Sequence, residues 1–73
     1  MKNKIIIDTR TAALELAAIT NSIDADVTIT DNNGMRVNAK SLIGALYAME
    51  FKEVWIECDI DIYDQIKDFV ATA

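Results

Sequence analysis

The sequence lacks histidine and proline altogether, and its 73 residues include only two glycines and one cysteine. Without histidine, the chain has no residue of the type that enzymes use most often for proton transfer, and it contains no glycine-rich phosphate loop. The single cysteine, Cys58, cannot form an internal disulfide, which argues against a disulfide-stapled secreted domain. The scarcity of glycine and proline argues against a loop-rich fold. These absences favour a non-enzymatic protein.

Long apolar runs are also missing. The amino-terminal run, residues 5–7, is too short for the core of a signal peptide. No stretch approaches the roughly 20 apolar residues that are needed to cross a bilayer. With 52% hydrophobic and 26% charged residues, the chain has the composition of a globular protein. We therefore expect one domain over residues 1–73, located in the cytoplasm.

Negative charge dominates, with a net charge of −5 and an isoelectric point of about 4.4. An acidic chain repels nucleic acids and anionic membranes and attracts basic protein surfaces, so we expect protein partners, with no nucleic acid and no membrane. The acidic residues Asp59, Asp61 and Asp64 do not have the spacing of a calcium loop. We expect no metal and no cofactor.

Apolar periodicity and turn residues predict seven secondary-structure elements. Either Asp8 or Thr9 can cap the first helix, and residues 31–34 favour a hairpin turn because Asn and Gly tolerate positive φ. In chain order we expect a strand over residues 4–7, a helix ending near 21–22, strands over 25–30 and 35–38, a helix over 42–49, a strand over 54–58 and a last helix capped by Asp61. The order β-α-β-β-α-β-α predicts an α+β fold. We expect a two-layer open-faced β-sandwich, with three helices on one face of a four-stranded antiparallel sheet.

The start of the first predicted helix combines Asp8, Thr9 and Arg10. A helix amino terminus offers free N–H groups and a positive dipole end, and a guanidinium adds a donor fork that suits phosphate. Thr9 and Arg10 are therefore candidate ligands of a phosphoryl group or of an acidic partner. The alternative is that Asp8 only caps its own helix and Arg10 is a solvated charge.

The second predicted helix begins at Ser41, where a serine is a common N-cap and also a good phosphate acceptor. This short helix has apolar residues on more than one side, and it cannot bury all of them in a two-layer domain. We expect some of Leu42, Ile43, Leu46 and Tyr47 to be exposed as a docking face. The alternative is that the thin core uses them.

The stretch Val37-Asn38-Ala39-Lys40-Ser41-Leu42-Ile43-Gly44 closely resembles the histidine-containing phosphocarrier proteins (HPr) of the bacterial sugar phosphotransferase system. The expected element order agrees with the open-faced sandwich of that family, and the likeness covers nearly the whole chain. In HPr, a segment of the form Gly-Leu-His-Ala/Thr-Arg-Pro-Ala-Ala opens the first helix. Its histidine accepts a phosphoryl group from enzyme I and passes it to sugar-specific acceptor domains.

The resemblance assigns roles to particular residues of this chain. Arg10 matches the phosphate-side arginine, Asp8 stands at the position of the histidine, and Thr11 stands at that of the proline. Ser41 matches the regulatory serine that a dedicated kinase phosphorylates in many Gram-positive bacteria. The apolar patch that docks onto enzyme I, onto acceptor domains and onto a transcriptional regulator is matched by Leu42, Ile43 and Leu46.

These observations lead to one main hypothesis and two alternatives. We expect an HPr-like regulatory protein that cannot carry phosphate on histidine, docks through its second helix and is switched by phosphorylation of Ser41. Asp8 would place one permanent negative charge where HPr holds phosphohistidine. The first alternative is a phosphoryl carrier that uses Asp8 in place of histidine. The second is a structural or interaction module that retains only the fold.

The connection after the first strand suggests a further possibility of assembly. HPr has a loop between the first strand and the histidine, whereas Ile7 here is expected to run directly into Asp8. A short, strained hinge favours the exchange of an end element between protomers. We therefore hypothesise a homodimer formed by exchange of the first strand.

Overall fold

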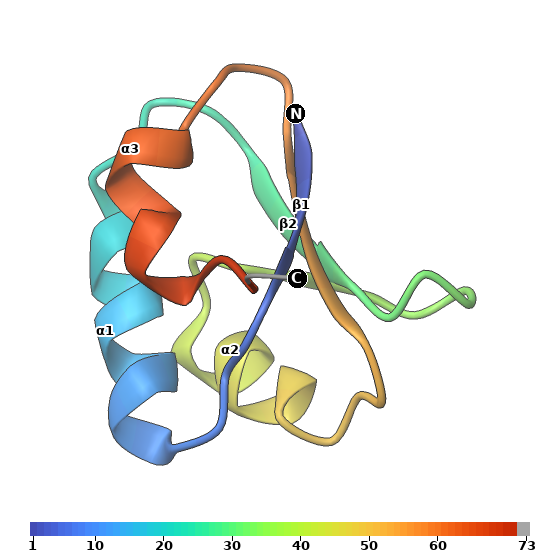
Figure 1. The fold of residues 1–73 in the computed structure, drawn as a ribbon. Helices are drawn as coiled ribbons and strands as arrows, with labels where there is room; N and C mark the ends of the chain where they lie inside the picture. Colours follow the sequence, from blue (N-terminus) through green and yellow to red (C-terminus); the bar gives the residue numbers. More distant parts are fainter. Residues whose placement is uncertain (72–73) are drawn as a thin grey trace.

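The computed structural model describes residues 1–71 and has an α+β fold (Figure 1). The four strands form one antiparallel open sheet, accompanied by three α-helices and one 3₁₀ turn, η1. The elements are β1 (Lys2–Ile5), α1 (Arg10–Asn21), β2 (Val27–Thr30), β3 (Arg36–Asn38), α2 (Leu42–Ala48), β4 (Val54–Cys58), α3 (Tyr63–Ile66) and η1 (Lys67–Phe69). The α+β class, the antiparallel four-stranded sheet and the order of the elements are confirmed.

The sheet has the strand order β1-β4-β2-β3, so β4 lies between β1 and β2. Ile56 of β4 pairs with Ile29 of β2, and both side chains are fully buried. Burial alternates along β4, with Val54 and Cys58 also buried while Trp55 and Glu57 are half-buried. This alternation, expected from the sequence, means that one face of the sheet packs against the hydrophobic core.

The first strand covers residues 2–5, so the prediction of a strand over residues 4–7 is wrong. Its pairing with β4 ends at Ile5, opposite Val54. The N–H of Ile6 then donates to the carbonyl of Phe69 (2.8 Å), and the N–H of Ala71 donates to the carbonyl of Lys4 (2.9 Å). β1 is therefore hydrogen-bonded on both sides, to β4 and to the segment that follows α3.

The expected direct passage from Ile7 into the first helix is also wrong. Residues 6–9 connect β1 to α1, and none of them has a positive φ. Ile6 is exposed in this connection, whereas Ile5 and Ile7 point into the core. The buried side chains of Ile5 and Ile7 hold the connection in place, and its backbone does not adopt the strained left-handed conformation.

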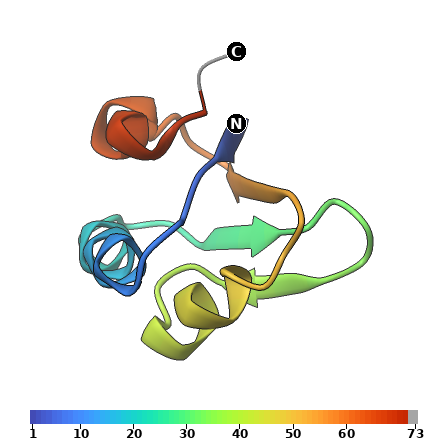
Figure 2. The ribbon, with the colours of Figure 1, turned by 60° about the horizontal axis from the view of Figure 1, so that its bottom comes forward.

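Helix α1 is held in the core by a stripe of mostly small residues. Ala13, Leu16, Ala17 and Thr20 are buried, and the small side chains allow the helix backbone to approach its neighbours closely. α1 contacts both α2 and α3, and α2 lies beside β3 (Figure 2). None of the helices in residues 1–71 has both the length and the apolar character that crossing a membrane requires.

The last helix begins at Tyr63, and its N-cap is Ile62, which makes no side-chain capping hydrogen bond, so the prediction of Asp61 as the cap is wrong. The Asp61 carboxylate accepts a hydrogen bond from the N–H of Tyr63 (3.0 Å) at the start of the segment. α3 has only four residues, and η1 continues it before the chain extends at Val70 to pair with Ile5. Ile62 and Ile66 are buried in the core.

Candidate functional site

The amino terminus of α2 is built on Ser41. The Ser41 backbone is extended (φ −86°, ψ 125°), and its hydroxyl oxygen accepts a hydrogen bond from the N–H of Gly44 (3.2 Å). The Ser41 N–H in turn donates to the carbonyl of Asn38 (3.1 Å), which links the helix start to the end of β3. Ser41 is therefore an N-cap, as expected, and such a cap stabilises a helix by about 1 kcal/mol.

Hydrogen bonds from α1 fix the backbone just before Ser41. The buried Thr20 hydroxyl donates to the carbonyl of Ala39 (2.8 Å), and the Asn21 amide donates to the carbonyl of Lys40 (2.8 Å). In return, the Lys40 ammonium donates to the carbonyl of Ile23 (2.6 Å) beyond the end of α1. The position of Ser41 thus depends on contacts across a sequence separation of about twenty residues, which the residue pattern did not reveal.

An apolar surface follows directly on the helix start. Ile43 is 79% exposed, Tyr47 52% and Leu42 43%, while Leu46 is half-buried against the core. The Tyr47 ring meets the Phe51 ring edge to face, with ring centroids 5.9 Å apart. Exposure of these side chains agrees with the expectation from the sequence. We call Leu42, Ile43, Leu46 and Tyr47 the α2 patch.

The buried side of α2 consists of two alanines, Ala45 and Ala48. Leu42, one of the residues expected to be exposed, lies outside this buried side. Gly44 and the two alanines let the helix backbone lie close to β3, and a Cβ at Gly44 would stand 2.5 Å from the carbonyl oxygen of Asn38.

A shallow groove of about 330 Å³ separates α1 from α2 beside the α2 patch. Leu14, Leu46 and Met49 supply its apolar walls, and Arg10 and Glu50 supply the charges at its rim. The structure therefore brings Arg10 together with Leu46, two of the candidate residues. Leu14, which is 49% exposed, was not identified from the sequence, although its apolar side chain lies outside the buried stripe of α1.

The start of α1 is capped by Thr9 and not by Asp8. The Thr9 hydroxyl oxygen accepts from the N–H of Ala12 (3.0 Å). Asp8 is exposed, and its carboxylate makes no hydrogen bond or ion pair within residues 1–71. The interpretation of Asp8 as a helix cap is wrong. Arg10 is likewise exposed and makes no ion pair in this part of the chain.

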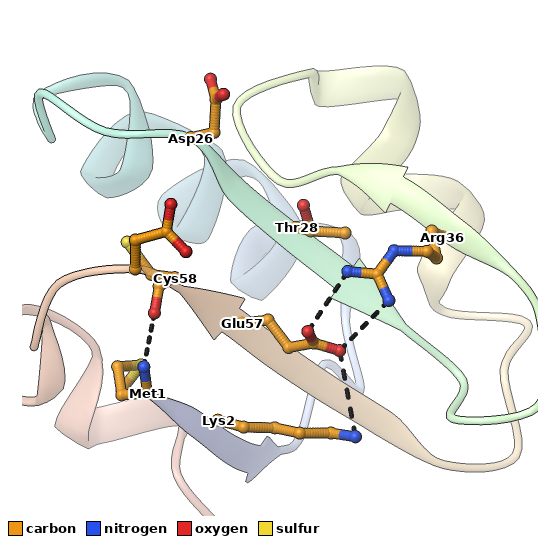
Figure 3. A pocket seen from close by; sticks show the side chains of 8 residues that line it. Met1, Lys2, Asp26, Thr28, Arg36, Glu57 and Cys58 are labelled. Carbon is orange, nitrogen blue, oxygen red and sulfur yellow. Dashed lines mark hydrogen bonds and ion pairs between the residues drawn. The ribbon is translucent and has the colours of Figure 1, made fainter.

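The open face of the sheet carries a separate polar cluster. Glu57 of β4 accepts two hydrogen bonds from the Arg36 guanidinium (3.2 and 3.4 Å), and the Lys2 ammonium lies 3.9 Å from the same carboxylate (Figure 3). Lys2 also lies over the Trp55 ring, 5.4 Å from its centroid. These opposite charges compensate one another, so the cluster serves to join β1, β4 and β3 across the solvated face.

Metal-binding residue types are not grouped in the described part of the chain. Residues 1–71 contain no cluster of three or more histidine, cysteine, aspartate or glutamate side chains with the geometry to hold a metal ion. Cys58 is a free thiol that is buried in the core. Comparisons of the chain with protein-family models, with curated proteins and with solved structures find no match.

Proposed function

We propose that the chain is an HPr-like, non-carrier regulatory protein that docks onto protein partners through the α2 patch and is switched by phosphorylation of Ser41. The observation that carries the proposal is the position of Ser41. Its hydroxyl lies at the first turn of α2, immediately before the exposed side chains of Leu42 and Ile43. A modification at this hydroxyl therefore acts at the edge of the surface that a partner would cover.

The proposal includes the finer architecture expected from the resemblance, a two-layer open-faced sandwich of the HPr type. The alternating burial along β4 and the polar residues on the other face of the sheet support it. The order of strands and helices is the one that the resemblance implies.

Phosphorylation would change the charge of the α2 patch without removing its apolar side chains. A phosphate adds about −1.5 to −2 charges near neutral pH. The ammonium of the neighbouring Lys40 is directed to the carbonyl of Ile23 and keeps its single positive charge, which is smaller than the charge that the phosphate adds. The added charge would repel an acidic partner surface, would be costly to bury against an apolar one and would attract a basic one.

The groove beside the patch gives Arg10 a part in docking. Its guanidinium has no intramolecular ion-pair partner in residues 1–71, and it lines the same groove as Leu46. Arg10, with the nearby hydroxyl of Thr9, would bind an acidic group or a phosphoryl group of the partner. By the same proposal, the partners are a kinase that acts on Ser41 and a transcriptional regulator or other phosphotransferase components.

A second candidate function rests on Asp8. Because Thr9 supplies the helix cap, the Asp8 carboxylate is exposed and uncommitted at the position of the HPr histidine. It could serve as a fixed negative charge, or it could accept a phosphoryl group as an acyl phosphate. The carrier function predicts transfer of phosphate from phosphoenolpyruvate through enzyme I, and loss of that transfer in Asp8→Ala.

The main proposal is tested by incubating the chain with ATP and an HPr-type serine kinase and measuring the intact mass. We expect one added phosphate on the unmodified chain. Ser41→Asn is the matched control, since asparagine can still cap the helix but has no hydroxyl to phosphorylate. If the kinase modifies an authentic HPr but leaves this chain unchanged, the regulatory switch is refuted, and an interaction module that retains only the fold becomes the better description.

A further inference from the structure

The turn between β2 and β3 combines an asparagine with a following glycine. Asn33 and Gly34 are both exposed, and Gly34 has a φ of +105°. Apart from its two chain neighbours, a Cβ at Gly34 would have no atom within 4 Å, so no other part of the described chain crowds this side of the turn.

The hydrogen bonds of the turn leave the Gly34 nitrogen free. Asp31 accepts from the N–H of Asn33 (2.7 Å) and from the N–H of Met35 (3.0 Å). Between them, the N–H of Gly34 donates to no group within residues 1–71. The Asn33 side chain also makes no hydrogen bond there, so neither reacting group is held by the fold.

We infer that Asn33 is a site of spontaneous deamidation in the folded protein. The Gly34 nitrogen, after losing its proton to hydroxide, attacks Cγ of Asn33 and forms a C–N bond, and the side-chain nitrogen leaves as ammonia. The product is a cyclic imide. Water then adds to one of the two imide carbonyls and breaks one C–N bond, which leaves an aspartyl or an isoaspartyl residue at position 33.

The neighbouring Asn32 shows why position 33 is selected. The Asn32 side chain is held, because its Oδ1 accepts a hydrogen bond from the Lys2 ammonium (2.6 Å). Its nucleophile would be the nitrogen of Asn33, whose N–H is engaged by Asp31. Residue 33 also has a Cβ that hinders attack, whereas Gly34 has none.

The other asparagines are held by secondary structure. At Asn38, the nucleophile would be the nitrogen of Ala39, whose N–H donates to the carbonyl of Val27 (2.9 Å). The Asn21 amide donates to the carbonyls of Ala17 and Lys40. Asn3 lies within β1 and is followed by a lysine. The reaction is therefore expected at Asn33 and not elsewhere.

Deamidation would change the charge and the backbone of this turn. A new carboxylate would join Asp31, Glu50 and Glu53, which line one hollow together with Asn33, and Lys52 is the one cation there. An isoaspartyl linkage would also insert a methylene into the main chain between β2 and β3. Both changes should weaken the hairpin, and neither depends on the proposed function.

The test is an incubation of the purified chain at mildly alkaline pH, followed by intact mass and by fragmentation that locates the modified residue. We expect the mass increase that corresponds to replacement of NH₂ by OH, located at Asn33, with isoaspartate detected by an isoaspartyl methyltransferase. The folded chain should react within about tenfold of the rate of the urea-unfolded chain, which corresponds to a barrier difference of about 1.4 kcal/mol or less.

Two variants make the assignment specific. Asn33→Gln should lose the mass increase, because glutamine must close a larger ring. Asn32→Asp keeps an oxygen for Lys2 and should react at Asn33 like the unchanged chain. The inference is overturned if the increase maps to another asparagine, if Asn33→Gln retains it, or if only the urea-unfolded chain reacts.

Discussion

Gly44 in α2 lies against the backbone carbonyl oxygen of Asn38 at the end of β3, so closely that a Cβ would stand 2.5 Å from that oxygen. The same carbonyl accepts the hydrogen bond from the Ser41 N–H (3.1 Å), so it cannot move away without disturbing the helix start. This contact fixes how near α2 and the α2 patch can approach the sheet.

Gly44→Ala should therefore destabilise the protein, although alanine is the better helix former by about 1 kcal/mol. Overpacking against a fixed backbone group costs about 1–3 kcal/mol, and at a distance as short as 2.5 Å we expect this cost to exceed the gain in helix propensity. We expect a lower midpoint of urea unfolding. Ile43→Ala, at an exposed position of the same helix, should leave the midpoint nearly unchanged. An equal or higher midpoint for Gly44→Ala would show that the two elements can separate freely.

Thr20 provides a test of whether the hydrogen bonds from α1 hold the backbone just before Ser41 in place. Its buried hydroxyl donates to the carbonyl of Ala39, so Thr20→Val leaves that acceptor unpaired at nearly constant volume. The free energy of unfolding should fall by about 1–3 kcal/mol. Thr20→Ser keeps the hydroxyl and should retain more of the stability in the same chemical denaturation. A Thr20→Val variant as stable as the unchanged chain, with a loss only in Thr20→Ser, would assign the role of Thr20 to its methyl group.

The capping role of Ser41 can be separated from its proposed role as a phosphate acceptor. Ser41→Ala removes the acceptor for the Gly44 N–H and should cost about 1 kcal/mol of stability. Ser41→Asn and Ser41→Asp each retain a capping oxygen and should stay near the stability of the unchanged chain. Thermal unfolding measures all three. A Ser41→Ala variant as stable as Ser41→Asn would contradict the capping role.

The sequence was sufficient where the local pattern decides the structure. Residues such as Asn33 and Gly34 marked the hairpin, Ser41 marked a helix start, and the alternation at Val54–Cys58 marked a half-buried strand. The sequence did not predict features that depend on contacts between residues far apart in the chain. β1 ends at Ile5 because this residue lies opposite Val54, where β4 begins, and no local pattern could indicate that register.

The candidate site was likewise only partly visible in the sequence. Apolar residues too numerous for a short helix indicated the exposed positions of the α2 patch. Leu14 was missed because only the packing of α1 beside α2 brings it to the same groove. Asp8 and Thr9 were equally good caps by residue type, and the hydrogen bond to Ala12 distinguishes them.

Exchange of the first strand between two protomers was hypothesised from a short, strained hinge, but residues 6–9 separate β1 from α1 without a positive φ, so the exchange has lost that support and stands only as a proposal with a defined test. All hydrogen-bond partners of β1, on β4 and on residues 69–71, can be supplied equally well by a second copy. Exchange predicts a dimer in size-exclusion chromatography with light scattering at high concentration. A monomer at every concentration rules the exchange out.

Docking through the α2 patch predicts a loss of partner binding that is independent of folding. Ile43 is 79% exposed, so Ile43→Lys should leave the free energy of unfolding within about 0.5 kcal/mol. If Ile43 lies at the centre of the interface, the same change should weaken binding to an HPr-dependent transcriptional regulator by about 2 kcal/mol or more, roughly thirtyfold. Isothermal titration calorimetry gives the dissociation constant. Ile60→Lys is the matched control, because Ile60 is also exposed, at 49%, and lies between β4 and α3, away from α2. Equal affinities for the two variants would place the interface elsewhere, whereas a loss confined to Ile43→Lys would locate it on α2.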